Sequence, residues 1–441
     1  MKEAKRQAKG HRWWRLGLLT VVMLLVVAAC GDDDAGTTTT AAEETTTTAA
    51  EETTTTAASA TTEAPPVEGT AYKIGFVASE TGPGSGLGVP EANTARMLAE
   101  QWAGGVTGPD GVHHSVEVII LDDESNADNG AALVTRLIEE DQVDVLVAGT
   151  LSGNALAMAP IAEEAMIAMI SMASSRGIIE SEGQTRPWLF KTPQDNQHSA
   201  AWQAEYLNSL GVTSVCYLYE NGAYGQDTLN SAKQFFEPAG ITIAFEGSFE
   251  RTDTEFPIMT GAQASGCGAV VVGSIPPGSS SVTQAAREFL PDLPIIGGHG
   301  SCNSQYISLA PDAVEGTVLP CGKLLFADTL PDSDPQKANL LQYIADYTAF
   351  TGGEPISTFG GHAWDALMWA GEALSSLEEN ADLDARRAAI RDYVETEITD
   401  WPGTGGVFNI SADDHLGLDY TGLGFVKVQD GGYINFPSSD W

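Results

Sequence analysis

The sequence predicts an α/β protein whose folded part consists of two doubly wound, parallel-sheet lobes of similar build. Apolar segments of strand length alternate with segments of helical length, first between residues 73 and 173 and again between residues 196 and 297. The connections between successive strands are long enough to form helical crossovers, which parallel strands require. Two α/β units in series therefore follow from the order of the segments.

The first unit alternates four strands with three helices. The segment KIGFVAS is apolar almost throughout, as expected of a strand covered on both faces. A glycine-rich loop, GPGSGLG at 82–88, follows it. The predicted strands are 73–79, 116–123, 143–149 and 167–173, and the predicted helices are 90–102, 127–140 and 155–165.

The second unit repeats this alternation. Its predicted strands are 214–220, 241–249, 269–274 and 294–297, and its predicted helices are 196–210, 225–237, 255–265 and 279–290. Three further helices are expected after residue 321, at 335–351, 359–379 and 384–397. A glycine-rich, strand-like tail over 405–436 ends the chain.

The first 29 residues have the order of a secretory signal peptide. Basic residues precede an apolar run over 16–29, which is too short to span a bilayer comfortably. The run ends in VAAC, which resembles the bacterial lipobox, so Cys30 is predicted to be diacylated and to anchor the mature protein to the outside of the cell membrane. The alternative is an ordinary signal peptide in which Cys30 is incidental.

Residues 30–70 are predicted to form a disordered stalk behind the lipidated cysteine. Residues 37–58 repeat TTTTAAEE with an eight-residue period, and nothing in this segment can bury apolar surface. A flexible segment of this length would hold the folded part away from a membrane.

The charge of the chain excludes one class of partner. Acidic residues number 60 against 21 basic residues, for a formal net charge of −39. A surface this acidic repels phosphate backbones, so no nucleic-acid partner is expected.

Four cysteines follow Cys30, and an even number in an exported chain indicates disulfides. Three pairings are possible, and neighbours in sequence would give Cys216–Cys267 and Cys302–Cys321. The alternative is that one pair remains as buried thiols. Because no CxxC pair is present, a zinc site is not expected. No other metal and no cofactor is expected either.

The loops that follow the predicted strands are the place to look for a ligand site. In open α/β sheets, ligands bind at the carboxyl ends of the strands, beside the first turn of the next helix. These loops are rich in glycine and serine, which supply backbone N–H and hydroxyl donors to an anion such as a carboxylate. They lie at 79–88, 149–154, 172–176, 220–225, 273–278 and 298–303.

An ordered string of motifs resembles the type I periplasmic-binding-protein fold over about 72–430. The motifs are IGFVASETGPGSGLG, LIEEDQVDVLVAGTLSGNALAMAPIAEE, AMISMASS, ENGAYGQD and GGHAWDAL. They are most similar to the branched-chain amino-acid (Leu/Ile/Val) substrate-binding proteins of ABC importers. The resemblance implies two lobes that close on a ligand by a hinge, with lobe one formed by 72–193 plus 323–400 and lobe two by 194–322 plus 401–441.

The resemblance also implies ligand-binding residues. Ser152 matches a serine that holds the ligand carboxylate, and Ala173 and Ser175, with Ser174 between them, match an element that binds the head of the amino acid. Tyr224 matches a tyrosine that covers the ligand from lobe two. Each has a purely structural alternative: Ser152 as a helix N-cap, Ser175 as the cap of a turn, and Tyr224 as packing at the rim.

The sequence departs from the amino-acid binders in two loops. In one of them, Ser274-Ile275-Pro276 replaces an aromatic residue that flanks the ligand in the family. The loop GGHGSC places His299 where the family has a carboxylate for the ligand ammonium, and a neutral histidine cannot replace that charge. Glu80 is the nearest acid that could compensate, and Leu87 is expected near the mouth of the cleft, against an apolar part of the ligand. Amides, urea-like solutes and organic acids therefore join amino acids as candidate ligands.

The leading hypothesis is a lipid-anchored, monomeric solute-binding protein that delivers a small ligand to an ABC permease. The second is a sensory or regulatory module of the same fold, and the third is a hydrolase on the same stalk. An enzyme is not expected, because the sequence has no GxSxG, HExxH or GxxxxGK[ST] motif and no GxGxxG followed by the required acid.

Overall fold

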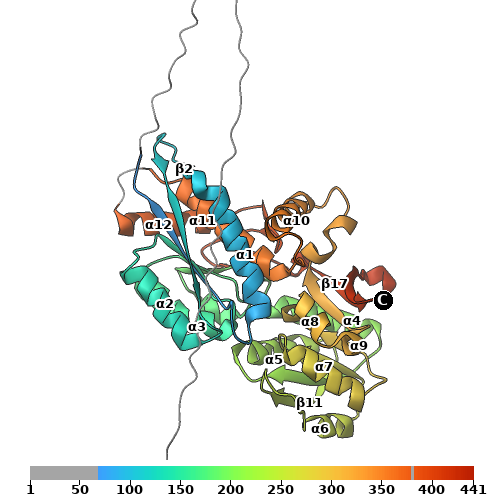
Figure 1. Ribbon diagram of the computed structural model, residues 1–441. Coiled ribbons are helices and arrows are strands. Elements are labelled where there is room, and N and C mark those ends of the chain that lie inside the picture. The colour runs from blue at the N-terminus through green and yellow to red at the C-terminus, as the bar shows by residue number, and fades with distance from the viewer. Residues whose placement is uncertain (1–67, 379–381) are drawn as a thin grey trace, which may run out of the picture. The chain divides into compact units, whose positions relative to one another are not determined.

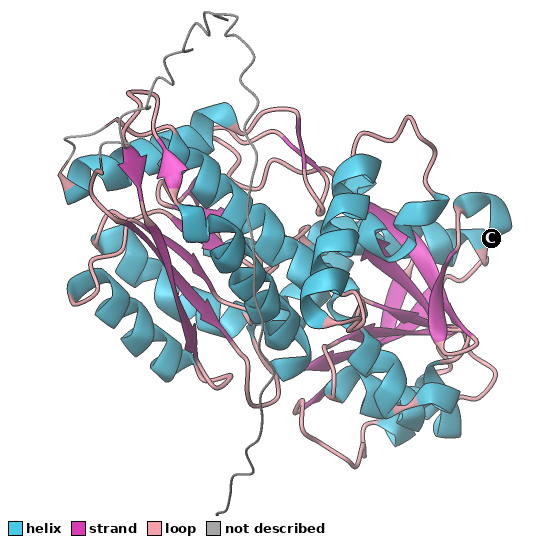
Figure 2. Ribbon diagram, turned by 45° about the horizontal axis from the view of Figure 1, so that its top comes forward, coloured by secondary structure: helices cyan, strands magenta, loops and turns pink. Residues whose placement is uncertain are grey.

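The computed structural model describes residues 68–378 and 382–441. The signal peptide, Cys30 and nearly all of the stalk lie outside these residues. Between Glu68 and the C-terminus the described chain forms two large sheets, each flanked by helices, and three sheets of two strands (Figures 1 and 2). No helix within the described ranges is both long and apolar enough to span a membrane.

The first sheet has five parallel strands in the order β4-β1-β5-β6-β9. They are β1 (Tyr72–Ala78), β4 (Val116–Asp122), β5 (Val145–Ala148), β6 (Met169–Ser171) and β9 (Leu189–Lys191). Helices α2 and α3 lie on one side of this sheet, and α1 and α11 lie on the other (Figure 1). Their bounds, with those of α12, are α1 (Ser85–Gln101), α2 (Ala127–Glu139), α3 (Ser152–Glu164), α11 (Thr358–Ser375) and α12 (Leu383–Glu397).

The second sheet has seven strands in the order β11-β10-β12-β13-β14-β17-β18. They are β10 (Ser214–Glu220), β11 (Thr242–Phe249), β12 (Ala269–Gly273), β13 (Ile295–Gly297), β14 (Val318–Gly322), β17 (Leu423–Gln429) and β18 (Gly432–Asn435). Its first five strands are parallel, whereas β17 is antiparallel to both β14 and β18.

The remaining helices and hairpin strands complete the two lobes. The helices are α4 (Asn196–Ser209), α5 (Ala223–Phe236), α6 (Met259–Ser265), α7 (Gly278–Phe289), α8 (Ser304–Leu309), α9 (Pro311–Val314) and α10 (Lys337–Thr351). Three short hairpins are formed by β2 (Val106–Thr107) with β3 (His113–His114), β7 (Glu180–Ser181) with β8 (Gln184–Thr185), and β15 (Trp401–Pro402) with β16 (Val407–Phe408).

The segment that follows residue 400 contacts helix α11. Asp365 of α11 accepts hydrogen bonds from the backbone N–H groups of Thr404 (2.7 Å) and Gly405 (2.8 Å). The ring of Phe408 packs edge-on against Trp369, also of α11, at 4.7 Å between centroids. Because α11 packs on α1 in lobe one, the segment that follows residue 400 is attached to lobe one.

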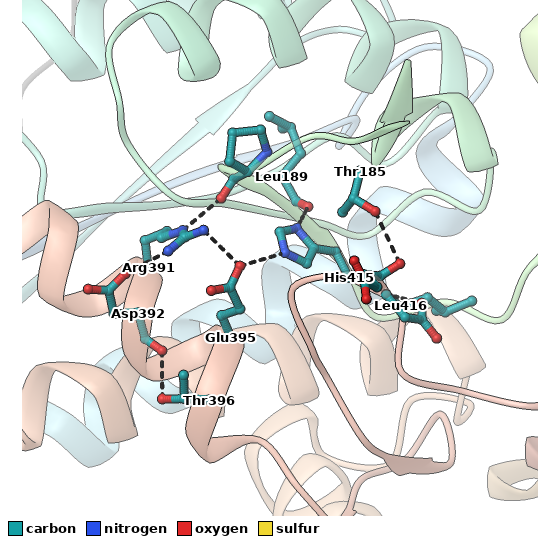
Figure 3. A network of polar contacts seen from close by, with 11 residues as sticks. Thr185, Leu189, Arg391, Asp392, Glu395, Thr396, His415 and Leu416 are labelled. Atoms are coloured by element: carbon teal, nitrogen blue, oxygen red, sulfur yellow. Dashed lines mark hydrogen bonds and ion pairs between the residues drawn. The ribbon is translucent and has the colours of Figure 1, made fainter. Parts of the chain in front are cut away.

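A polar network extends this attachment as far as His415 (Figure 3). The His415 ring contacts the Leu189 carbonyl through Nδ1 (2.8 Å) and Glu395 through Nε2 (3.2 Å). Arg391 of α12 binds the same Glu395 carboxylate at 2.7 Å and the Pro187 carbonyl at 2.9 Å. These contacts join α12, the β9 edge of the first sheet and the C-terminal segment.

Both disulfides lie in lobe two or at its border. The structure joins Cys216 to Cys267, with 5.5 Å between their Cα atoms, and Cys302 to Cys321, with 5.8 Å. This is the pairing of sequence neighbours, which was one of three possibilities open from the sequence. The first joins β10 to the segment before β12, and the second joins the segment before α8 to β14.

Replacing both cysteines of one pair with serine is expected to lower the free energy of unfolding by about 2–4 kcal/mol, because the unfolded chain regains the freedom of the closed loop. Urea unfolding of the two double variants would measure this loss. If alkylation and mass spectrometry detected free thiols at all four positions in the native protein, this result would contradict the expectation.

Candidate ligand-binding cleft

A cavity of about 190 Å³ lies where the carboxyl ends of the two sheets face each other. This volume is below the roughly 300–1,000 Å³ typical of pockets for drug-sized ligands, so it suits a small metabolite. Both lobes contribute side chains. The lining residues include Leu87, Ser125, Thr150, Leu151, Ser152, Gly153, Asn154, Met172, Ala173, Ser174, Pro193, Gly222, Ala223, Tyr224, Arg251, Ile275, His299, Gly300, Phe359 and His362.

The structure brings six of the eight residues singled out from the sequence into this lining. They are Leu87, Ser152, Ala173, Ser174, Tyr224 and His299. The other two lie outside it. Ser175 is buried beside the lining, at the start of a short 3-10 turn, and Glu80 forms an ion pair of 2.7 Å with Arg96. The Glu80 carboxylate is therefore already paired.

The N-terminus of α3 points its backbone donors at the cavity. Ser152 is the first residue of this helix, and Leu151 at the N-cap supplies no side-chain hydrogen bond. The first N–H groups of a helix have no intrahelical partner. Because Ser152, Gly153 and Asn154 all line the cavity, these N–H groups are available to a ligand. The Ser152 side chain does not occupy the N-cap position, which was its structural alternative.

The N-terminus of α5 presents a second set of donors from lobe two. Its N-cap is Gly222, which has no side chain, and Ala223 and Tyr224 follow in the first turn. All three residues line the cavity, and the Tyr224 hydroxyl accepts a hydrogen bond from the Gly300 N–H at 3.1 Å. The partial positive ends of two helices thus face the same space, which favours an anionic ligand.

Two buried histidines lie in the lining with unpartnered ring nitrogens. Within the described ranges, both ring nitrogens of His299 lack a hydrogen-bond partner. Nδ1 of His362 lacks one within these ranges as well. The two residues are only 6% and 3% exposed. Burial lowers the pKa of each to about 3, so both rings are neutral near pH 7. Their free nitrogens are placed to bind a ligand.

One arginine enters the lining from the loop after β11. Arg251 forms a bidentate ion pair with Glu220, through Nε at 3.2 Å and Nη2 at 2.5 Å. The Glu220 carboxylate also accepts hydrogen bonds from the Ser274 hydroxyl (2.7 Å) and the Ile275 N–H (3.1 Å). Glu220 therefore positions the guanidinium, whose Nη1 has no hydrogen-bond partner among the described residues.

One wall of the cavity is apolar. Leu87 and Leu151 from lobe one pack with Tyr224 and Ile275 from lobe two and with Phe359 at the start of α11. A ligand with an aliphatic or aromatic body would bury that body against this wall.

A buried charge cluster supports the polar side of the cleft. The Lys191 ammonium donates to the Ser174 carbonyl at 2.5 Å and lies 4.0 Å from Asp195. Asp195 also binds Arg176 at 2.9 Å. Burial lowers the pKa of Lys191, and the nearby Asp195 carboxylate opposes that shift. The bond from Lys191 to the Ser174 carbonyl holds the loop that carries Ala173 and Ser174. Lys191 and Asp195 lie where the chain passes from β9 to α4.

Arg251 and His362 were not singled out from the sequence, and neither carries a local signal for a ligand site. The described residues hold no group of three or more His, Cys, Asp or Glu side chains arranged for a metal ion.

Replacing His299 with glutamine is expected to reduce the acid sensitivity of the fold. The pKa of His299 is about 3 in the folded protein and about 6.5 in the unfolded chain, so between these values the unfolded chain binds more protons. The stability that the neutral ring contributes is complete above about pH 6.5 and is lost as the pH falls; at pH 5 the loss is about 2 kcal/mol.

Urea unfolding at pH 7 and pH 5 would measure this difference in the wild type, in His299→Gln and in the control His113→Gln, which changes a histidine outside the cavity. Wild type and control should each lose about 2 kcal/mol more than His299→Gln. An equal loss in all three would contradict the expectation.

Comparisons with known proteins agree with this architecture. Residues 71–432 match the family described as periplasmic binding protein. The Leu/Ile/Val-binding protein BraC3 of Rhizobium johnstonii is 22% identical over 249 residues, which make up 56% of this chain and 66% of that protein. The chain thus matches just under two thirds of the length of that relative.

Two solved structures illustrate the range of similar proteins. An extracellular ligand-binding receptor from Rhodopseudomonas palustris HaA2 is 25% identical, with a TM-score of 0.76 over 83% of this chain and 99% of that one. A solute-binding protein of an ABC transporter from Rhodopseudomonas palustris BisB5, in complex with 3,4-dihydroxybenzoic acid, is 23% identical, with a TM-score of 0.68 over 83% of this chain and 96% of that one.

Proposed function

Because this chain belongs to the periplasmic binding protein family, we propose that it is an extracytoplasmic solute-binding protein that passes a small, amino-acid-like ligand to an ABC permease. The observation that carries the proposal is the cavity between the lobes, which receives an uncapped helix N-terminus from each of them. A ligand there would contact both lobes at once, so binding would favour the closed arrangement.

Two similar proteins support a small carboxylate as ligand. The Rhizobium protein is described as binding leucine, isoleucine and valine, and the Rhodopseudomonas structure holds an aromatic carboxylic acid. The alternative function is a sensory module of the same fold for an amide, a urea-like solute or an organic acid. The neutral histidines in the lining favour such ligands. In either case the family is one of binding proteins, not enzymes.

A thermal-shift panel of amino acids, amides and organic acids tests the proposal, because a ligand that binds only the native state raises its melting temperature. Ser152→Ala and Tyr224→Ala should weaken binding about ten- to a hundredfold, since each removes a contact that a buried ligand would need. Ser175→Ala is the matched comparison, because the family resemblance predicts that Ser175 contacts the ligand, whereas Ser175 does not line the cavity. Failure of every solute to bind would contradict the proposal.

We also propose that Cys30 carries the lipid that anchors the protein, although it lies outside the described residues. Cys30→Ala is expected to release the processed protein from the membrane fraction, because the acyl chains supply the affinity for the bilayer. Immunoblots of membrane and soluble fractions would check this. A processed variant that stays fully in the membrane fraction would refute the anchor.

A further inference from the structure

We propose that the cleft selects a small carboxylic acid that has an apolar body and a hydroxyl or oxo group, and that it discriminates against α-amino acids. The inference names the ligand class of the solute site and therefore rests on the proposed function. It follows from which charges face the cavity and which do not.

The donors in the cavity suit a carboxylate. The first turns of α3 and α5 converge on it from opposite lobes, and neither has a side-chain cap. The Arg251 guanidinium lines the same space and keeps one nitrogen, Nη1, without a partner among the described residues. Helix N-termini and arginine are the groups that proteins use to bind carboxylates.

No counter-charge for an ammonium group is present in the lining. None of the described residues that line the cavity is an aspartate or a glutamate. Within the described chain, three carboxyl groups are hydrogen-bonded to residues of the lining. Glu91 accepts a hydrogen bond from the Thr150 hydroxyl, and burial raises the pKa of Glu91 well above its usual value, which favours its neutral form. The other two carboxylates, Glu220 and Asp123, are occupied by protein donors. Glu220 accepts from Arg251, Ser274 and Ile275, and Asp123 accepts from the Ser79 hydroxyl at 2.6 Å and the Asn154 amide at 2.7 Å.

An α-amino acid would therefore bury its ammonium unpaired, which is far more costly than burying a neutral polar group with a partner. Glu80 does not change this conclusion. Its carboxylate lies outside the lining and is paired with Arg96.

The two histidines suit a neutral polar group instead. A neutral imidazole offers one donor and one acceptor, so His299 and His362 together can satisfy a hydroxyl or an oxo group. Both ring nitrogens of His299 and Nδ1 of His362 are buried without partners among the described residues, which is costly unless a ligand binds them. The apolar wall of Leu87, Leu151 and Phe359 then covers the body of the acid.

Matched ligand sets test the inference directly on the wild-type protein. Calorimetry would compare L-leucine with 2-hydroxy-4-methylpentanoate and 4-methyl-2-oxopentanoate, and L-phenylalanine with phenyllactate and phenylpyruvate. Within each set of three acids the size is nearly constant, and only the group beside the carboxylate changes. The neutral amides of the two hydroxy acids would serve as ligands that lack both the carboxylate and the ammonium. At least one hydroxy or oxo acid should bind about a hundredfold more tightly than its amino acid, the ratio expected when a buried charge loses its partner.

A reciprocal variant reverses the preference. His299→Asp supplies a carboxylate to the cavity, so the ratio of acid to amino-acid affinity should fall at least tenfold. His113→Asp makes the same change outside the cavity and should leave the ratio unchanged. Melting curves and circular dichroism identify any variant that fails to fold, in which case the wild-type comparison decides alone.

The outcomes separate the two proposals. An amino acid that binds wild-type protein as tightly as its hydroxy acid, or amides that bind while every acid fails, would overturn the ligand class and leave the binding function intact. Absence of binding by every solute in the panel would overturn both.

Discussion

Replacing Arg251 with methionine is expected to lower the free energy of unfolding by about 3–5 kcal/mol, because it leaves the Glu220 carboxylate buried without its counter-charge. Glu220 is only 1% exposed at its side chain. The remaining donors, from Ser274 and Ile275, are neutral and cannot balance the charge. The same variant should weaken the binding of small carboxylic acids by about ten- to a hundredfold, because the guanidinium lines the cavity.

The double variant Arg251→Met/Glu220→Gln separates these two roles. It removes both charges, so urea unfolding should show most of the stability restored, whereas calorimetry should still show weak binding of the acid. Recovery of binding in the double variant would show that Arg251 does not contact the ligand. Lys233→Met, which breaks the exposed pair with Glu246, is the control and should change stability by about 1 kcal/mol or less.

Replacing Asp195 with alanine is expected to cost about 3–5 kcal/mol through its buried ion pairs and about 1 kcal/mol more through the helix cap. Asp195 is fully buried, binds Arg176 and lies near Lys191. Its side chain also accepts the Gln197 N–H at the start of α4, within a capping box. Urea unfolding would measure the total loss.

Two further variants divide this loss. Asp195→Asn keeps an acceptor for the helix cap but removes the charge, so it should retain about 1 kcal/mol of the stability lost in Asp195→Ala. Adding Lys191→Met to Asp195→Asn removes the buried cation and should recover part of the remainder. If Asp195→Ala costs less than about 1 kcal/mol, the cluster is not the ion-pair network that its geometry describes.

The strands that lie between two layers of helices were predictable, because burial on both faces makes them continuous apolar segments. β1 and β10 illustrate this, and both agree with the prediction to within one residue at each end. β9 and β14 were missed. The first is three residues long and ends in Lys191, and the second contains Pro320 and Gly322. Only tertiary contacts, such as Asp195 beside Lys191, explain why these segments are buried.

The site was predictable where it depends on topology and not where it depends on packing between distant segments. Loops at the carboxyl ends of strands bring Ser152 and Tyr224 to the cavity, and that rule can be applied to a sequence. His362 instead lies within α11, more than 200 residues after Ser152, and reaches the cavity because α11 packs against lobe one. No local pattern distinguishes it from an ordinary core histidine.

The late pairing of β17 with β14 has a consequence for biosynthesis. Val318 of β14 is aligned with Lys427 of β17, so the second sheet stays incomplete until β17 and β18 have been synthesised. The first sheet likewise needs α11 and α12 to cover it. Contacts between residues so far apart in sequence form slowly, because a long loop must close first. Neither lobe can therefore reach its final packing before its late segments have been synthesised, which are α11 and α12 for the first sheet and β17 for the second.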